Sequence, residues 1–191
     1  PTIKDYWSAP THHESLSMSQ LRTLIYFMGD IAWRGAHQVL LDLAGQRATI
    51  PEDVFFYHKT QAEVFMDEGL LDESEQHLSQ AQHIAKEIEE MDVAELIKLQ
   101  NSLAVLSFRN QRLVLAAQLF LQCIDNSKAH GYSAMAYQNN HAYVLMNDGK
   151  PQEAEHSFRT LLKEQVEAYD PNHHHVLQTK CNIGMALYHQ E

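Results

Sequence analysis

Histidine is the residue type with the most obvious chemical potential in this sequence. There are 13 histidines, and the densest cluster is the triplet His173, His174 and His175. Consecutive residues of a helix point in different directions, whereas a metal ion needs its ligands on one face. His77 and His83 are also unsuitably spaced, and the sequence contains neither His-Glu-x-x-His nor Cys-x-x-Cys. We therefore expect no metal site and interpret the histidines as solvated or loop residues.

The acidic side chains are the second group that could do chemistry, as paired carboxylates for acid and base catalysis. The densest run lies at residues 87–92, but its spacing is typical of the solvated face of a helix. The sequence contains no glycine-rich phosphate loop, and no serine or cysteine has the neighbouring motif of a nucleophile. It therefore predicts a protein that is not an enzyme and needs no cofactor.

The composition narrows the classes of partner. With 14 basic and 25 acidic residues the formal charge is −11, which disfavours direct binding of nucleic acid by this segment. No apolar run reaches the roughly 18 residues needed to cross a bilayer, and the N-terminus does not resemble a signal peptide. The two cysteines, Cys123 and Cys181, stand at helical positions and are interpreted as reduced. We expect a cytoplasmic location and no membrane contact.

The elements that must position any site are indicated by a repeated spacing of small residues. A small residue is followed seven positions later by a helix break and five after that by another small residue, in three copies: Ala62, Gly69, Ser74; Ala104, Gln111, Ala116; Ala142, Gly149, Ala154. Small residues let two helices approach closely, and glycine suits the left-handed residue that ends a helix. Each copy is therefore predicted to be an antiparallel helix hairpin.

The same frame extends in both directions along the chain. Ser74, Ala116 and Ala154 are each followed four residues later by a large apolar residue, and Ala36 upstream fits the same frame. Downstream, Gly184 aligns with Ala142. The unit recurs at alternating offsets of 38 and 42 residues. A recurring unit of this length is typical of a helical repeat protein.

These residues resemble the tetratricopeptide repeat (TPR) family. The clearest copy contains Ala136, Tyr137, Asn139, Asn140, Ala142, Tyr143, Leu145, Gly149, Ala154 and Phe158. The chain departs from the family in its longer period and in having Gln111 and Ile31 at the position of the turn glycine. The stretch at residues 169–173, before a new first helix, is similar to the longer repeats of kinesin light chains and of bacterial regulators related to the maltose activator.

The resemblance implies an all-α fold, a right-handed superhelical solenoid of antiparallel helix hairpins. It covers residues 15–191 as four hairpins and a lone final helix, and leaves residues 1–14 as an N-terminal arm or linker. The sequence starts without methionine and stops within a repeat, so we expect a piece of a longer protein.

In this architecture the first helix of each hairpin lines the concave surface. Asparagines recur there in register at Asn101, at Asn139 with Asn140, and at Asn182. A carboxamide has two donors and an acceptor, which suits it to hold the backbone of an extended peptide, and TPR domains that bind such peptides often use asparagine there. The alternative is that these side chains only bond a neighbouring helix or water.

Cationic and apolar residues surround the asparagines. Lys59, Lys98 and Arg109 are candidates for holding a ligand carboxylate, or are simply solvated. Phe108, Tyr143 and Met146 recur about one helical turn from the asparagines and could form an adaptable apolar strip. Their alternative role is ordinary packing between repeats.

We therefore predict a non-catalytic module that binds a protein or peptide ligand in the concave groove. The resemblance implies a sensor or partner-docking domain of a larger bacterial regulator. One alternative is a structural scaffold that forms homo-oligomers through the C-terminal edge at Ile183, Leu187 and Tyr188. Another is a regulatory domain attached to an enzyme or ATPase.

Overall fold

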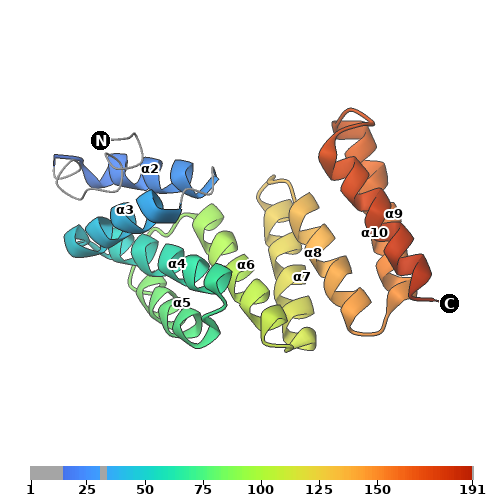
Figure 1. Cartoon of the computed structure of the whole chain (residues 1–191), viewed down its shortest axis with the longest axis horizontal. Helices are drawn as coiled ribbons and strands as arrows, with labels where there is room; N and C mark the ends of the chain where they lie inside the picture. Colours follow the sequence, from blue (N-terminus) through green and yellow to red (C-terminus); the bar gives the residue numbers. More distant parts are fainter. Residues whose placement is uncertain (1–14, 31–33, 191) are drawn as a thin grey trace. The chain divides into compact units, whose positions relative to one another are not determined.

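A computed structural model describes residues 15–30 and 34–190, and these residues are helical apart from short turns. The predicted arm at 1–14 lies outside the described residues, as do Ile31 and the side chain of Ala36. Nine helices are described, and their order along the chain is shown in Figure 1: α2 Met18–Asp30, α3 Arg34–Arg47, α4 Pro51–Glu68, α5 Leu71–Ala85, α6 Val93–Arg109, α7 Leu113–Ala129, α8 Met135–Asn147, α9 Pro151–Ala168 and α10 His174–Tyr188.

The chain divides into two compact units, Pro1–Met91 and Asp92–Glu191. Unit 1 contains α2 to α5, in which α2 packs on α3, α3 on α4 and α4 on α5. Unit 2 contains α6 to α10, in which each helix packs against the next and α10 also contacts α8. The prediction of an all-α fold built from successive hairpins is confirmed in both units.

The hairpins are closed by the small residues that the spacing identified. Ala62, Ala104, Ala142 and Ala154 are completely buried, as predicted. Ser74 is also fully buried, and its hydroxyl donates a hydrogen bond of 2.9 Å to the carbonyl oxygen of Ala62. A larger side chain at these positions would separate the helices, because interaxial distances depend on the residues at the contact.

The turns inside the hairpins need a residue with positive φ. Gly69 has φ 80° and Gly149 has φ 73°, as expected for glycines that end a helix. Gln111, which stands at the glycine position in the α6–α7 hairpin, adopts the same left-handed conformation with φ 58°. Pro51 and Pro151 begin α4 and α9, where the missing N–H costs nothing.

Unit 2 carries the candidate site, and its core holds the site in place. Phe158, Ile183 and Ala186 pack with Ala142 in one buried cluster, while Phe120 and Val144 form another with Ala104. The expectation that Ile183 belongs to an exposed edge is wrong, because this side chain is only 8% exposed and packs beside Phe158.

Two further expectations from the sequence concern membranes and cysteine chemistry. Among the helices described, none is both long and apolar enough to cross a membrane. Cys123 is buried and Cys181 is exposed, and neither forms a disulfide. Burial raises the pKa of the Cys123 thiol to about 12, so this thiol is protonated at neutral pH.

Candidate functional site

Helix α8 carries four of the ten residues that the sequence singled out, Asn139, Asn140, Tyr143 and Met146. Asn139 and Tyr143 are four residues apart and Asn140 and Tyr143 are three apart, so their side chains lie on the same side of the helix. The ring of Tyr143 meets the ring of Phe108 from α6 edge to face, with 5.7 Å between centroids. This face of α8 therefore joins an amide region to an aromatic pair.

The aromatic pair is partly open to solvent. Tyr143 is 39% exposed, while Phe108 is half-buried against the cluster around Ala104 and Phe120. Met146, one turn further along α8, is half-buried against the cluster around Phe158. Phe108 and Met146 therefore serve the core as well as the surface, as the alternative interpretation held, whereas Tyr143 presents a large exposed area.

Two of the asparagines bond to each other. The side-chain N–H of Asn182 on α10 donates to Oδ1 of Asn139 at 2.9 Å, and Asn182 itself is only 6% exposed. Asn182 is thus a support that fixes the orientation of Asn139. For this pair the alternative in which an asparagine bonds a neighbouring helix is realised, whereas Asn140 is half-buried and takes no part in this bond.

Asn139 and Asn140 line a hollow between α8, α9 and α10, which we call the amide hollow. Its volume is about 410 Å³. The residues around it are neutral or imidazole side chains: Ser133, Met135, Ala136, Tyr137, Asn139, Asn140, Gln165, Tyr169, His175, Gln178 and Thr179. This volume lies within the range found for small-molecule and cofactor sites, although most such sites have a more apolar lining.

The deepest polar residues of the amide hollow were not identified from the sequence. Gln165 on α9 is 4% exposed and Thr179 on α10 is 1% exposed. Gln165 lies in register with Phe158 and Leu161 on the buried face of α9, so a polar residue at an apolar position was the signal that could have found it. Its Oε1 is buried and has no hydrogen-bond partner among the described residues.

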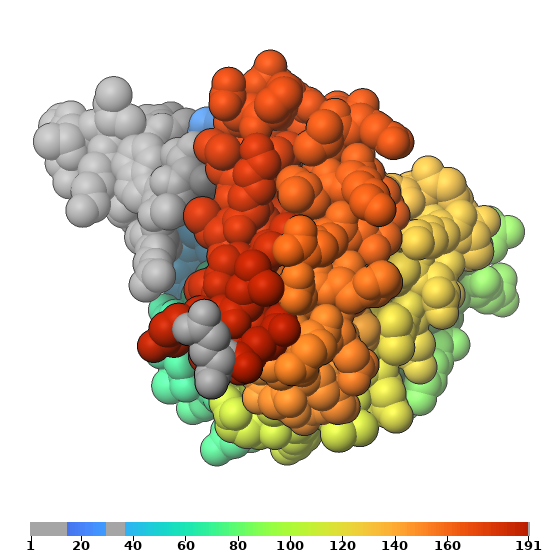
Figure 2. Space-filling view, turned by 90° about the vertical axis from the view of Figure 1, so that its right-hand side faces the viewer, coloured from blue at the N-terminus to red at the C-terminus, as the bar shows by residue number. Residues whose placement is uncertain are grey.

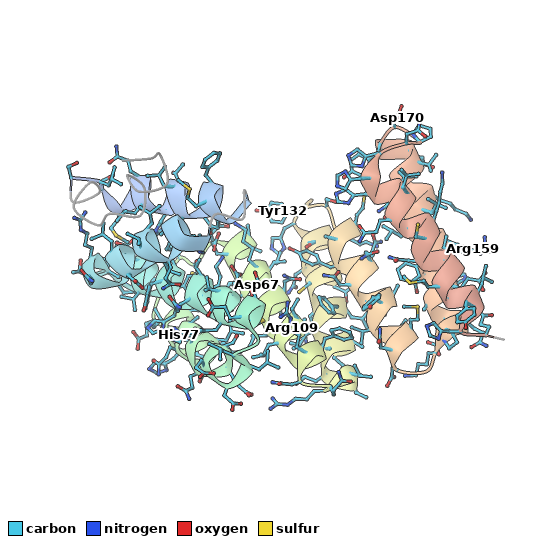
Figure 3. All side chains as sticks on the ribbon, in the orientation of Figure 1. Asp67, His77, Arg109, Tyr132, Arg159 and Asp170 are labelled. Atoms are coloured by element: carbon cyan, nitrogen blue, oxygen red, sulfur yellow. The ribbon has the colours of Figure 1, made fainter. Side chains whose placement is uncertain are left out.

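The other predicted residues of unit 2 lie on α6. Asn101 is half-buried, and its Oδ1 is likewise covered without a partner among the described residues. Lys98 is exposed and its ammonium lies 2.7 Å from Oε1 of Glu95, so it is already paired locally. Arg109 is exposed at the last position of α6, next to Phe108 (Figure 3).

Lys59 lies in unit 1 and is not part of this face. It is 1% exposed, and its ammonium lies 5.8 Å from the centroid of the Tyr26 ring. A long aliphatic stem allows a lysine to be buried in this way. A residue so covered has no surface to offer a ligand, so we leave Lys59 out of the candidate site.

The histidine triplet lies at the start of α10, in the turn that follows Asp170, which Figure 3 labels. The ring of His173 stacks on Tyr169 with 4.4 Å between centroids, and its Nδ1 accepts a hydrogen bond from the backbone N–H of His175. The first of these histidines therefore caps the helix. No group of three or more potential ligands suited to a metal ion occurs within residues 15–30 and 34–190.

Comparisons with known proteins place the fold. Two crystal structures of the nearly identical TPR-like repeats of a candidate kinesin light chain from Podosopora anserina align with 95% of this chain. Their TM-scores are 0.69 and 0.67, the alignments cover 87% and 88% of those chains, and both are 16% identical to it. The crystal structure of BtubC (BKLC) from P. vanneervenii aligns over 92% of this chain and 68% of its own, with a TM-score of 0.62 and 20% identity.

These likenesses bear out the predicted TPR-like fold and its similarity to kinesin light chain repeats. No protein-family model and no curated protein sequence matches this chain. At 16 to 20% identity the structural likeness concerns the fold alone.

Proposed function

We propose that this chain is a non-catalytic interaction module that binds an extended segment of a partner protein along α8. The single observation that carries the proposal is the continuity of one face of α8, where the amide hollow and the Phe108–Tyr143 ring pair adjoin. Amides suit the polar backbone of a peptide, and exposed aromatic rings suit its apolar side chains.

The polar half of this face is supported from behind. The side-chain N–H of Asn182 donates to Oδ1 of Asn139, and the amino group of Asn139 takes no part in this bond. A pre-oriented amide binds more tightly than a mobile one because less conformational entropy is lost on binding. Asn140 is not fixed in this way and supplies the adaptable contact.

The charges of unit 2 favour an acidic or neutral segment over a basic one at the α6 end. Arg109 follows Phe108 directly, so a carboxylate on the ligand could reach the guanidinium while an apolar neighbour covers the ring. Arg109 directly follows Phe108 at the end of α6, about three helical turns beyond Lys98. We therefore assign Arg109 as the main cation beside the ring pair.

The test is selection of binding peptides from a displayed random library with the 191-residue chain, followed by titration of a selected peptide by fluorescence anisotropy. Asn140→Ala and Tyr143→Ala should each weaken binding about ten- to a hundredfold, since a lost buried contact costs on the order of 1 to 3 kcal/mol. Gln152→Ala, on the exposed side of α9, is the matched control and should leave binding unchanged. Equal binding by all four proteins would contradict the proposal.

The proposal also concerns the kind of larger protein to which this module belongs. We propose that it is the sensor or partner-docking domain of a larger bacterial regulator in the cytoplasm, a role suggested by its resemblance to long-period TPR proteins. A regulatory domain attached to an enzyme or ATPase is the competing setting. Co-purification of the full-length protein with its partner, followed by nucleotide hydrolysis assays, would separate the two.

A second candidate function, self-association, is favoured by the outer face of α10. Leu177, Met185 and Tyr188 are 45%, 41% and 73% exposed, and they recur at helical spacing around the exposed Gly184. Figure 2 looks onto α9 and α10 and shows this part of α10 (red) uncovered. If the face mediates dimers, sedimentation equilibrium will detect them, and Met185→Lys with Tyr188→Lys will abolish them; a monomer at all concentrations excludes this function.

A further inference from the structure

The amide hollow has a lining without formal charge. None of its eleven residues is Asp, Glu, Lys or Arg. His175 is the one imidazole among them, and desolvation together with the neighbouring His174 and His173 lowers its pKa, which favours the neutral ring at pH 7. A charged ligand group entering this hollow would lose hydration and find no opposite charge in return. The chemistry of the lining therefore selects an uncharged group.

Gln165 gives the hollow an unmet hydrogen-bonding requirement. Its side chain is 4% exposed, and the buried Oε1 has no partner among the residues described. Buried polar groups in proteins are nearly always paired, and one left unpaired destabilises the fold. An acceptor in this position calls for an N–H or O–H donor from outside the chain.

Other amides and a hydroxyl surround Gln165 in the same hollow. Asn140 and Gln178 come from α8 and α10, and the nearly buried Thr179 adds a hydroxyl. Oδ1 of Asn139 is occupied by Asn182, which leaves the Asn139 amino group as a donor. The lining thus offers donors around one unpaired acceptor.

A carboxamide is the ligand group that matches this arrangement most completely. Its N–H donates to a carbonyl oxygen such as Gln165 Oε1 while its own oxygen accepts from an amino group such as that of Asn140. The match remains if the oxygen and nitrogen of the Gln165 amide are exchanged by a 180° rotation, because a carboxamide ligand has both donors and an acceptor. A hydroxyl donates and accepts through a single oxygen, whereas a carboxamide donates and accepts through two separate atoms, and a carboxylate has no donor.

We propose that the amide hollow recognises a primary carboxamide, supplied by an asparagine or glutamine side chain of the segment bound along α8. This inference rests on the proposed function, because the peptide must run past the hollow to insert that side chain. It makes the module selective for a carboxamide side chain, Asn or Gln, at one position of its partner. The alternative source is a free amide metabolite such as glutamine.

The inference is tested by NMR on the 191-residue chain with N-acetyl-glutamine methylamide as the probe. The side-chain NH₂ signals of Gln165 and Asn140 should shift saturably as the probe is added. N-acetyl-glutamate methylamide, which replaces the amide by a carboxylate, should shift them at least tenfold less. Gln165→Leu should abolish the response, and Gln152→Leu on the exposed side of α9 should retain it. Equal responses to both probes, or none to either, would overturn the inference.

A second experiment distinguishes a peptide side chain from a free metabolite as the source of the carboxamide. It also distinguishes failure of the carboxamide inference from failure of the proposed function. Library peptides selected by the chain should be enriched in Asn or Gln at one position, and Gln165→Leu should remove that preference. Peptides that need Tyr143 but show no such enrichment would overturn the carboxamide inference and leave the proposed function standing. Binding of free glutamine with no binding of any peptide would overturn both the peptide source and the proposed function.

Discussion

The two units share their hairpins but differ in what they bury. Unit 1 has 6 basic and 15 acidic residues, a formal charge of −9, whereas unit 2 has 8 and 10, a charge of −2. Unit 1 buries the charged residues Asp53 and Lys59, while the buried polar residues described in unit 2 are all serines, a threonine and amides. Unit 1 also buries the neutral Thr60, Gln61 and Ser74, so among the described residues the same packing frame buries charged and neutral polar groups in unit 1 and only neutral ones in unit 2.

The difference shows which parts of the repeat are constrained. The small residues at the crossings, such as Ala62 in unit 1 and Ala142 in unit 2, are fully buried in both. Polar residues between the hairpins have diverged, because a buried polar group needs only a partner and not a particular type. We expect function to follow the divergent residues and stability to follow the shared ones.

The largest effect should come from breaking the ion pair of unit 1. Arg22 bonds to Asp53 while its guanidinium lies 5.1 Å from the Phe56 ring centroid. Asp53→Ala leaves that guanidinium partly buried without its carboxylate, and should cost about 3 kcal/mol in the free energy of unfolding of unit 1. Hydrogen exchange of the α4 amides measures this loss, since it resolves one part of a chain from another.

Asp72→Ala is the control for the loss of Asp53. Asp72 also stands in the first turn of a helix, α5, but is exposed. Only the helix-dipole contribution is removed there, about 0.3 to 1 kcal/mol. If both substitutions cost the same, the buried pair contributes nothing and the contrast between the units loses its energetic basis.

The next largest loss of stability should come from overpacking the helix crossings, which both units close with a buried alanine. Ala62→Leu and Ala142→Leu should each overpack a helix crossing and destabilise their own unit by about 1 to 3 kcal/mol. The protection of α4 amides should fall in the first variant and that of α8 amides in the second. Ala129→Leu, at the exposed end of α7, should change neither. An Ala142→Leu protein with unchanged α8 protection would refute the common frame.

A smaller change in the free energy of unfolding, this time a stabilisation, is expected from substitution of Gln165. Leucine has nearly the same size and removes the buried unpaired oxygen, so Gln165→Leu should stabilise unit 2 by about 1 kcal/mol. The same change should abolish carboxamide binding. Thermal unfolding followed by circular dichroism supplies the measurement, and a lower melting temperature would mean that Gln165 is satisfied in the folded protein.

The sequence predicted the packing frame well because that frame depends on local spacing. The burial of Ala104 and Ala154 and the positive φ of Gly149 follow from a pattern that one helix hairpin imposes on its own residues. Even Gln111, which lacks glycine's conformational freedom, occupies the left-handed position that the frame assigned to it.

The candidate site was less predictable because it depends on residues far apart in the chain. Asn182 and Asn139 are 43 residues apart, and nothing in either local sequence indicates that one bonds the other. Lys59 was predicted to hold a ligand carboxylate or to be solvated, yet it is covered and lies near the Tyr26 ring. Such outcomes are decided by tertiary neighbours rather than by periodicity.

The last and smallest effect concerns the imidazole pair of unit 1. Nδ1 of His58 and Nδ1 of His77 lie 3.1 Å apart, and the rings of Tyr57 and Phe65 lie near His77. Desolvation lowers the pKa of both histidines, and the charge of His77 lowers that of His58 further. Asp42 and Glu68 are the carboxylates that line the adjoining hollow, together with His77.

Because the folded pKa values lie below the unfolded value of 6.5, the unfolded chain binds more protons in the window below pH 6.5. The folded state should therefore lose stability as the pH falls through 6.5 towards those lowered values, and be unaffected above it. The melting temperature should drop between pH 7.5 and 5.5, and drop less in a protein carrying His58→Gln and His77→Gln. His156→Gln, exposed on α9, is the control and should behave as wild type. An equal drop in all three proteins would show that the His58–His77 pair has no share in the acid response of unit 1.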